Sequence, residues 1–513
     1  MKRYLYKTIC LIIIMPFAGC LDLNEEPRAL LSSNGFYETL DALEVGVNGV
    51  YSSFLYGTDE AAQFRFIGSA RMYAALTGGD DLTTLAGGSK EEWRQFDQFT
   101  KDGNNSAVLW SSWMMPYAVI RAANTVLESA NNVNASQEQV DELLAEVHFL
   151  RGWSYFWLVR VFGEVPLVTS TEIDPEIGLS PVQDIYDLII DDFTFAEINL
   201  PETQDRNSKP NKYAAKAFLA KVYLTMGGWP LKQTDKYALA RDKALEVMNS
   251  GLYDLYPDIK TLWDLANEGD NEFIFGFEFC SLNDCGDNRF TSTFGSAPAK
   301  PASFLPNSQR RFSDYFIEIN FFKNFPEGPR KDAYFLTEVK QPNGSILTWE
   351  NFNTRHPHLS KFYEGSVPGT PTWEGHPVLT SRNRQLMRYA EVLLIYAEAQ
   401  AMAGAPDASA YEAINMVKRR AMGLDPDMPD ASVDLIPGLS ATAFQEAVLD
   451  ERGWELVGEL KRWFDLTRLE KVAEANANKD PRDLPILGSM EPDNYYAPIP
   501  AEEVLRNPKL GGN

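Results

Sequence analysis

Apolar side chains recur at helical spacing over most of this chain, and this pattern limits its possible folds more than any other feature. Steps of three and four residues place such side chains on one face of a helix. Two long runs follow these steps: Phe36, Leu40, Leu43, Val47, Val50 and Phe54, and then Leu143, Val147, Leu150, Trp153, Trp157 and Val161. We expect two amphipathic helices, with Trp153 and Trp157 in the core. The second should end at Gly163, because Gly suits a helix C-cap and Pro166 forbids continuation.

Four further segments have a helical pattern. They run from Ala214 to Met226, Leu386 to Met402, Ala410 to Met422 and Ala443 to Leu469. We expect the last to be one helix with alternating charges on its outer face. Several of these helices resemble members of antiparallel pairs rich in Ala, Leu and Tyr, which is typical of tetratricopeptide-like pairs that stack around a shared core. The sequence therefore predicts a mainly α fold, in which tetratricopeptide-like helix pairs form a scaffold.

One long segment lacks the helical period. Residues 271–380 are rich in Gly, Pro, Ser, Asn and aromatic residues, and Phe273–Phe279 has the composition of a strand. Because this length is too great for one loop, we expect a loop-rich irregular region with a few short strands over the scaffold. Function tends to lie on loops held by a rigid frame. We therefore predict a single domain at 36–513, with the scaffold at 36–270 and 381–513 and the ligand-binding region at 271–380.

The first twenty residues have the pattern of an export signal. Three basic residues lie within the first seven, and Ile9–Phe17 is an apolar run broken only by Pro16. A membrane-spanning helix needs about 20 apolar residues, so this run fits a signal-peptide core better than an anchor. The run leads through Ala18 and Gly19 directly into Cys20. A bacterial lipoprotein needs a cysteine at this place, because its thiol takes the diacylglycerol.

We therefore predict a lipoprotein signal peptide at 1–19, lipidation of Cys20 and a polar tether at 20–35. The alternative is an ordinary signal cleavage site that precedes a cysteine by chance. No later segment has the length and apolar character to span a membrane, so we expect attachment through lipid alone.

Charge and cysteine content argue against several other classes. The formal net charge of -25 argues against a nucleic-acid partner, which would need basic patches, and mildly against strongly anionic polysaccharides. Four residues separate Cys280 from Cys285. In an oxidising compartment the two could form a disulfide or remain free thiols. No second Cys or His pair lies at metal-ligand spacing, so the sequence does not indicate a zinc site.

A series of motifs extends along nearly the whole chain after the signal. The most specific is Arg388–Ala399 (RYAEVLLIYAEA). The others are EVHFLRGWSYFWLVRVFGEVPLV at 146–168, DIYDLIIDD at 184–192, the helix at 212–224, Ala413-Ile414-Asn415, Arg419-Arg420-Ala421, Glu451-Arg452 and Glu455-Leu456 with Arg462, Asp465, Leu466 and Arg468, Tyr496–Pro500, and Asn507-Pro508. In this order they resemble the RagB/SusD family of outer-membrane lipoproteins. The chain departs from the family at Lys209–Lys212, where a Gly-Arg start is more usual, and we interpret this as a change in helix entry.

The resemblance implies a fold and a role. The fold has tetratricopeptide-like helix pairs and a loop-rich face. The role is capture of oligosaccharides at the cell surface, as a lid on a SusC-like TonB-dependent channel in the outer membrane. Ligand contacts in such proteins come mostly from loops, so the motifs do not identify the ligand. Peptide capture, which some family members perform, stays open as the alternative.

Candidate ligand contacts follow from the chemistry of sugars. Sugar rings present apolar C–H faces and polar rims, so a receptor needs exposed aromatic rings beside carboxylate, amide or guanidinium groups. Two regions supply this mixture, the segment from Gly78 to Gln95 and the irregular region. The predicted contacts are Asp80, Asp81, Trp93, Arg94, Trp349, Asn351, Tyr363 and Trp373. For each aromatic residue, the alternative is packing beneath a long loop.

The sequence gives little support for catalysis or a cofactor. Asp80 and Asp81 could suggest a glycosidase pair, but adjacent residues point in different directions, and such carboxylates stand about 5 to 10 Å apart. The chain has no P-loop, G-x-S-x-G elbow, H-E-x-x-H helix or dinucleotide-binding motif. His356, His358 and His376 lie on Pro-rich loops without metal-ligand spacing.

Calcium could bind acidic loops, although none has EF-hand spacing. We therefore expect a binding protein that is not an enzyme and has no cofactor. A lipid-anchored hydrolase and a purely structural scaffold are the alternatives from other classes.

Overall fold

The structure is a computed structural model that describes residues 36–55, 71–87, 91–279, 314–340, 343–362 and 382–511. The predictions for Cys20, Cys280, Cys285, Tyr363 and Trp373 lie outside these ranges. Within them, no helix combines the length and apolar character needed to cross a membrane.

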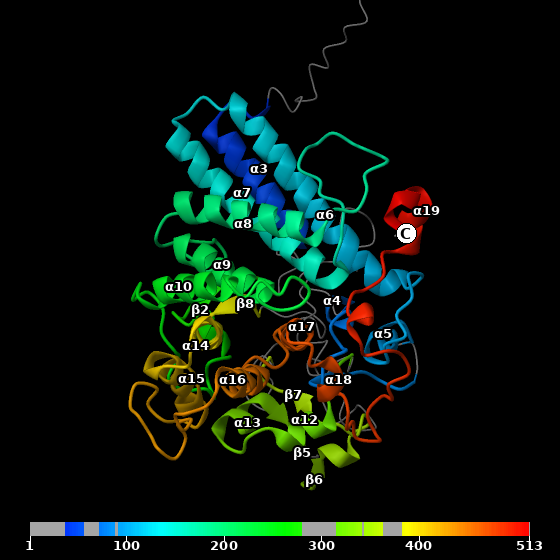
Figure 1. Cartoon of the computed structure of the whole chain (residues 1–513), viewed down its shortest axis with the longest axis vertical. Helices are drawn as coiled ribbons and strands as arrows, with labels where there is room; N and C mark the ends of the chain where they lie inside the picture. Colours follow the sequence, from blue (N-terminus) through cyan, green and yellow to red (C-terminus); the bar gives the residue numbers. More distant parts are fainter. Residues whose placement is uncertain are drawn as a thin grey trace, which may run out of the picture.

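Long helices form a stack that runs the length of the molecule (Figure 1). The first six are α3 (Leu40–Leu55), α6 (Ser106–Ser129), α7 (Gln137–Phe162), α8 (Val182–Asn199), α9 (Lys212–Met226) and α10 (Lys236–Met248). Each packs against the next along the chain. This confirms the predicted mainly α fold with a tetratricopeptide-like scaffold.

The ends of α7 follow from its sequence. Ser136 caps the start, where its Oγ accepts a hydrogen bond from the backbone N–H of Gln139 at 3.4 Å. Gly163 caps the end with a φ of 74°, a left-handed conformation that Gly adopts without strain. Trp153 and Trp157 are buried, as predicted.

The chain that departs from the family pattern forms the entry to α9. Asn211 is the N-cap, and its Oδ1 accepts a hydrogen bond from the Ala214 N–H at 2.8 Å. The chain at Lys209–Lys212 therefore still supplies a capped helix start. Ala217 and Ala220 are completely buried, and their small side chains let α8 and α10 approach α9 closely.

The second part of the chain continues the same stack. α14 (Tyr389–Ala403) packs against α10, although residues 249–388 separate the two helices in sequence. α15 (Ala408–Ala421) and α16 (Ala441–Glu455) then pack against α14. The core is therefore continuous across both helical parts.

A two-stranded sheet forms near both ends of the irregular region. β2 (Phe273–Phe277) pairs antiparallel with β8 (Arg384–Arg388). The strand predicted at Phe273–Phe279 is confirmed as far as Phe277. The helix predicted from Leu386 is wrong at its start, because the first three residues belong to β8, where pairing with β2 satisfies their backbone groups.

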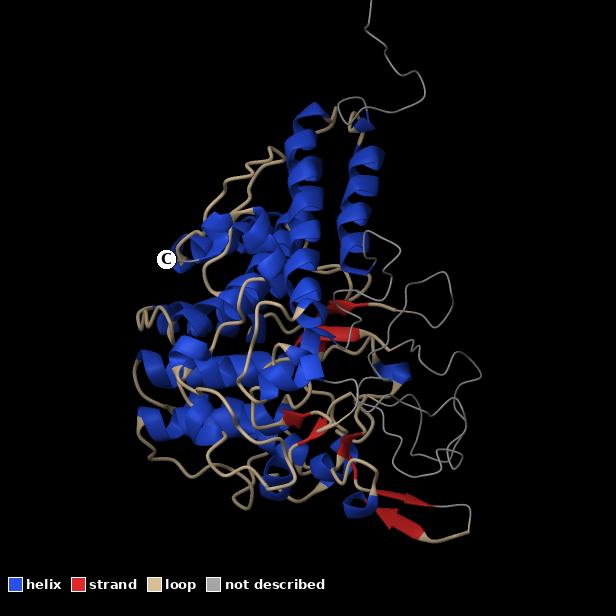
Figure 2. Ribbon diagram, turned by 90° about the vertical axis from the view of Figure 1, so that its right-hand side faces the viewer, coloured by secondary structure: helices blue, strands red, loops and turns tan. Residues whose placement is uncertain are grey.

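The other described strands are short and form two-stranded antiparallel sheets toward one side of the helical stack (Figure 2). They pair as β1 (Leu82–Thr83) with β3 (Phe316–Ile317), β4 (Phe335–Leu336) with β7 (His358–Leu359), and β5 (Glu338–Lys340) with β6 (Ile346–Thr348). Two short helices, α12 (Ile319–Asn324) and α13 (Pro329–Tyr334), lie among them in sequence. This confirms the loop-rich region with a few short strands.

The single helix predicted at 443–469 is two helices. α16 ends at Glu455, and α17 spans Arg462–Arg468. Between them, Gly458 has a φ of 75° and Leu460 a φ of 62°. The prediction of one helix is wrong because these left-handed residues turn the chain, while the apolar pattern continues across the turn.

Most charges of this segment face inward, although Glu446 and Asp450 are exposed. Glu451, Arg452 and Glu455 are buried in the interior. The prediction of alternating charges on an outer face is therefore wrong, because both exposed charges are acidic and the cations are buried. Opposite charges meet inside the protein, for example Arg452 Nε and Asp465 Oδ2 at 2.9 Å, and this pairing replaces the water contacts that burial removes.

Candidate functional site

A strand pairing positions Asp80 and Asp81. α4 (Arg71–Ala74) leads into the turn that holds them, and β1 follows directly. β1 pairs with β3, and the backbone N–H of Glu318 donates a 3.1 Å hydrogen bond to the Asp81 carbonyl oxygen. The turn therefore lies beside α12 in space, although the two are far apart in sequence.

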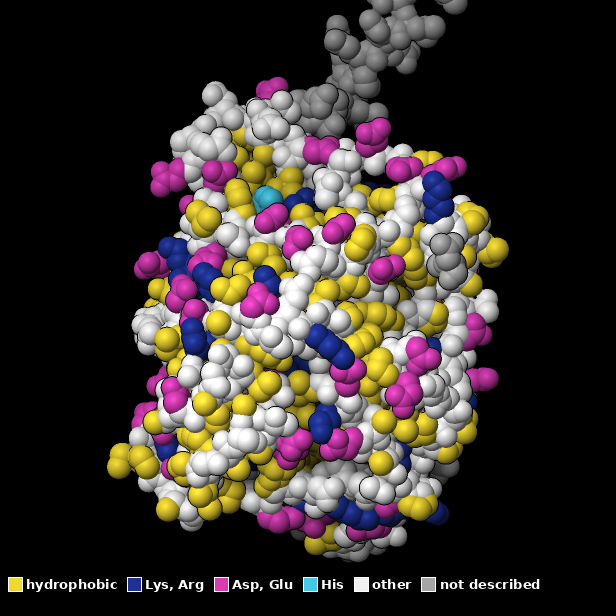
Figure 3. Space-filling view, in the orientation of Figure 1, with side chains coloured by type: hydrophobic (Ala, Val, Ile, Leu, Met, Phe, Trp, Pro, Cys, Tyr) yellow, Lys and Arg dark blue, Asp and Glu magenta, His cyan; other side chains and the backbone are white. Residues whose placement is uncertain are grey.

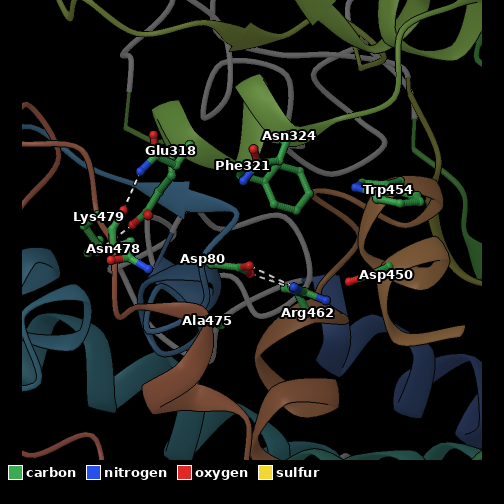
Figure 4. Close-up of a pocket in the computed structure, with 11 residues that line it drawn as sticks. Asp80, Glu318, Phe321, Asn324, Asp450, Trp454, Arg462, Ala475, Asn478 and Lys479 are labelled. Carbon is green, nitrogen blue, oxygen red and sulfur yellow. Dashed lines mark hydrogen bonds and ion pairs between the residues drawn. The ribbon is translucent and has the colours of Figure 1, made fainter. Parts of the chain in front are cut away.

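Asp80 lines a cavity of about 280 Å³, which we name the Asp80 pocket. The other walls come from α12, α16, α17 and the segment from Ala475 to Lys479. Phe321 and Asn324 of α12 lie across from Asp80, and Trp454 lies at one end (Figure 4). The pocket therefore combines aromatic rings with amide and charged groups.

Asp80 forms a two-point ion pair with Arg462. Arg462 Nε lies 2.6 Å from Asp80 Oδ1, and Nη2 lies 2.8 Å from Oδ2. Burial alone lowers the pKa of Arg462, but the Asp80 carboxylate outweighs this effect and the pKa is raised overall. The charges of both groups are thus largely satisfied by one another.

Asp81 points into the protein. Its side chain is 4% exposed, so it presents almost no surface to a ligand. Burial, the largest cause, and the charge of Asp80, the next largest, raise the pKa of the Asp81 carboxyl to about 7. The backbone N–H of Gly458 donates a hydrogen bond to this carboxyl group and opposes the rise. Asp80 and Asp81 therefore have different environments, although they are adjacent.

A second charged group closes the other side of the pocket. Lys479 Nζ lies 2.7 Å from Asp97 Oδ1 and 2.5 Å from Glu318 Oε1. Burial alone lowers the pKa of Lys479, but these two carboxylates raise it overall. Burial raises the pKa of Glu318, and Lys479 counteracts this only in part. The ammonium group is therefore already paired with carboxylates of the protein.

Trp93 and Arg94 lie on α5 (Glu91–Asp97). The Trp93 ring is half-buried and stacks on the buried ring of Tyr315, with centroids 5.5 Å apart and planes at 21°. Arg94 Nη1 donates hydrogen bonds to the carbonyl oxygens of Leu85 at 3.2 Å and Gly87 at 3.4 Å. Arg94 thus holds the loop after β1, and Trp93 offers a supported ring at the surface.

Trp349 and Asn351 lie on other elements, directly after β6. Trp349 is half-buried and packs on a small separate cluster that includes Phe352. Its ring meets Phe322 edge-on at 5.9 Å, and the Arg482 guanidinium lies 5.2 Å from its centroid. Asn351 is exposed, and its Nδ2 donates a 3.3 Å hydrogen bond to Thr348 Oγ1.

The structure therefore gathers only some of the predicted residues. The β1–β3 pairing positions Asp80 and Asp81, and Trp93 stacks on Tyr315 directly before β3. Trp349 and Asn351 belong to the β5–β6 hairpin and its own small core.

Sequence reasoning missed Phe321 and Trp454 as lining residues. The sequence indicated Arg462 only as part of a family motif and not as a lining residue. Trp454 is half-buried at one end of the pocket. Its one local signal is a large aromatic residue among charged neighbours in α16, a pattern that does not reveal the distant residues around it.

The described histidines have partners within the protein. His356 Nε2 lies 2.9 Å from Asp483 Oδ1, and His358 Nε2 lies 2.9 Å from Thr354 Oγ1. Across the described ranges, no group of three or more His, Cys, Asp or Glu side chains could hold a metal ion.

Acidic and basic side chains are interspersed on the face in Figure 3, without a broad basic surface there. The distribution on this face agrees with the formal net charge of -25.

Two protein-family models match the chain. The model described as "SusD family" matches residues 287–513, and the model described as "Starch-binding associating with outer membrane" matches residues 74–224. A SusD-like protein of Formosa agariphila is 28% identical over 540 residues, which cover 100% of this chain and 99% of the relative.

Solved structures show the same similarity. A SusD superfamily protein of Parabacteroides distasonis has a TM-score of 0.75 at 26% identity, and the match covers 92% of this chain and 98% of that one. A structure described as a laminarin-binding SusD-like protein has a TM-score of 0.70 at 25% identity, again over 92% and 98% of the two chains.

Proposed function

This chain belongs to the SusD-like proteins, and we propose that it binds a glycan at the outer surface of the cell. The proposal draws support from the family model whose description is starch-binding and from the laminarin-binding relative. Its role is capture without catalysis.

The observation that carries the proposal is the Trp93 ring, half-exposed and stacked on the buried Tyr315. A ring supported from beneath loses little freedom when a ligand covers it, so it suits the apolar face of a sugar. Arg94, the next residue on α5, holds the loop after β1 beside this ring. We propose Trp93 as the main stacking residue.

The β5–β6 hairpin provides a second candidate contact. Trp349 and the exposed Asn351 could meet a sugar ring and its hydroxyl groups, respectively. We retain Tyr363 and Trp373 as proposed contacts in the ligand-binding region at 271–380. Because such contacts are open to solvent, affinity for one short oligosaccharide should be modest and should rise with chain length.

The proposal includes a cellular setting. The family-model description associates the matched region with the outer membrane. We propose that Cys20 carries the lipid anchor at the cell surface after removal of residues 1–19. We also propose that the protein closes as a lid over a SusC-like TonB-dependent transporter, to which it delivers the glycan.

Affinity electrophoresis of residues 20–513, with Cys20 replaced by Ala, tests glycan binding in gels that contain a panel of polysaccharides. We expect one polymer to retard the protein. The Trp93→Ala change should weaken this binding about tenfold, the loss that corresponds to one stacking contact of about 1.4 kcal/mol. Tyr213→Ala, which removes a half-buried aromatic ring from α9, is the matched control and should bind normally.

Retardation that Trp93→Ala leaves unchanged would rule out Trp93 as the main contact, and the Trp349→Ala variant would then test the hairpin. Failure of every polymer to retard the protein would contradict the glycan proposal and favour peptide capture.

A further inference from the structure

The size of the Asp80 pocket limits what can enter it. Its volume is about 280 Å³. Pockets for drug-sized ligands usually span about 300–1,000 Å³, so this one has room for a single sugar ring and not for a chain. A glycan could therefore enter only with a chain end or a one-residue branch.

The pocket has the two kinds of surface that a sugar ring needs. Phe321 and the half-buried Trp454 provide apolar faces. The Asn324 amide and the Asp450 carboxylate provide polar groups, and neither has a hydrogen-bond or ion-pair partner among the described residues. These two side chains are therefore available to the hydroxyl groups of a ligand.

The charges of the pocket distinguish between classes of sugar. Its cations are already paired, Arg462 with Asp80 and Lys479 with Asp97 and Glu318. The Asp450 carboxylate adds a further negative charge, and the cation that acts on it, Arg462, is already paired with Asp80. The carboxylate of an acidic sugar would be repelled by Asp450, and no unpaired cation of the pocket would offset this repulsion. Hydroxyl groups of a neutral sugar can instead donate hydrogen bonds to the carboxylate.

We propose that the Asp80 pocket is a separate subsite that takes one terminal, uncharged sugar ring and rejects uronate rings. This inference rests on the proposed glycan function and assigns a substrate class to one part of it. The Trp93 ring then contacts the body of the glycan, whereas the pocket recognises its end.

Titration of residues 20–513, with Cys20 replaced by Ala, tests the pocket by NMR. The signal to follow is the indole N–H of Trp454, assigned by comparison with Trp454→Phe. The probes are glucose, galactose and mannose, each with its uronate, together with xylose and fucose. We expect at least one neutral sugar to shift the signal, and the uronates to bind at least about tenfold more weakly.

Asp450→Lys tests the charge argument. Asp450 is exposed, so the change should leave the fold intact, and it should reduce the preference for neutral sugars over uronates at least about tenfold. Asp191→Lys makes the same change at an exposed carboxylate of α8 outside the pocket, and it should keep the wild-type preference.

Three results would overturn the inference: no neutral sugar shifts the Trp454 signal, the uronates bind as well as the neutral sugars, or Asp450→Lys keeps the wild-type preference. If polysaccharide gels still retard the wild-type protein and Trp93→Ala weakens that binding, only the pocket assignment fails. If the gels also show no retardation, the proposed glycan function fails with it.

Discussion

At the scale of single residues, a family motif acts inside the protein. Glu391 belongs to the most specific motif and is completely buried. Lys221 Nζ and Lys461 Nζ each lie 2.8 Å from its carboxylate oxygens. Burial alone raises the pKa of Glu391, but these cations outweigh it and lower the pKa overall. Glu391 therefore joins three segments of the chain and does not face a ligand.

Asp81 should make stability depend on pH. Its pKa is about 7 in the folded protein, mainly through burial, and about 3.9 in an unfolded chain. Between these values the folded state holds a proton that the unfolded state releases. This contribution to stability therefore falls as pH rises through the window, by at most about 1.4 kcal/mol per pH unit.

Asp81→Asn removes the titrating group, so we expect the variant to gain stability relative to wild type between pH 5 and pH 8. Urea denaturation at both pH values measures this difference, with the exposed Asp191→Asn as control. An equal stability difference between variant and wild type at both pH values would show that Asp81 does not titrate in this window.

At the scale of elements, the turn between α16 and α17 shapes the pocket. α16 contributes Trp454 and Asp450, and α17 contributes Arg462. A continuous helix could not provide the left-handed turn at Gly458. A side chain at Gly458 would also lie 2.5 Å from Leu359 Cδ1.

We expect Gly458→Ala to lower the free energy of unfolding by about 1–3 kcal/mol, through backbone strain and this close contact. Chemical denaturation measures the loss. Gly178→Ala is the control, because a side chain there meets no atom within 4 Å and the change should stay within about 0.5 kcal/mol. Equal losses in both variants would contradict the special role of the turn.

At the scale of the whole molecule, one buried carboxylate connects the irregular region with the helices that follow it. Glu455 of α16 lies 2.8 Å from Arg330 Nη1, 2.8 Å from Arg388 Nη1 and 2.7 Å from Arg420 Nη2. These arginines come from α13, β8 and α15. Glu272, directly before β2, also pairs with Arg388 and Arg420. The network therefore joins α13, β8, α15 and α16 through buried ion pairs.

We expect Glu455→Gln to destabilise the protein by about 3–5 kcal/mol, because it leaves buried guanidinium groups without a compensating charge. Glu446→Gln makes the same change on the exposed side of α16, where Glu446 pairs with Lys471 at 3.2 Å. Its cost should be below about 1 kcal/mol. Comparable unfolding midpoints for the two variants would show that the buried network contributes little.

Local pattern predicts the cores of helices and the capped end of α7, but not the breaks between helices or the start of α14. Trp153 and Trp157 are buried as expected, because apolar spacing alone selects the inner face of a long helix. The same spacing continues across Gly458, so it does not reveal the break between α16 and α17. Alternating charge at Glu451 and Arg452 likewise resembles a solvated face, and only their burial shows that they are core residues.

The residues of the candidate site are even harder to predict from the sequence than the breaks between helices. Trp93 was predicted as a ligand contact from its polar surroundings, and it remains one as a proposal. Asp80 and Asp81 are adjacent in the chain, yet only Asp80 lines the pocket. The local signal at Trp454, an aromatic residue among charged neighbours, does not reveal its role, since residues far from it in sequence complete the pocket.

The sequence by itself determined the helical scaffold and the resemblance to a family. The scaffold follows from the short-range spacing of apolar residues, and the resemblance follows from contiguous motifs. The tertiary structure decided which charges are buried and which side chains line the Asp80 pocket. The physical reason is that burial and pairing depend on contacts between distant segments. Asp80 and Arg462 meet only because β1 pairs with β3 and α17 turns back from α16.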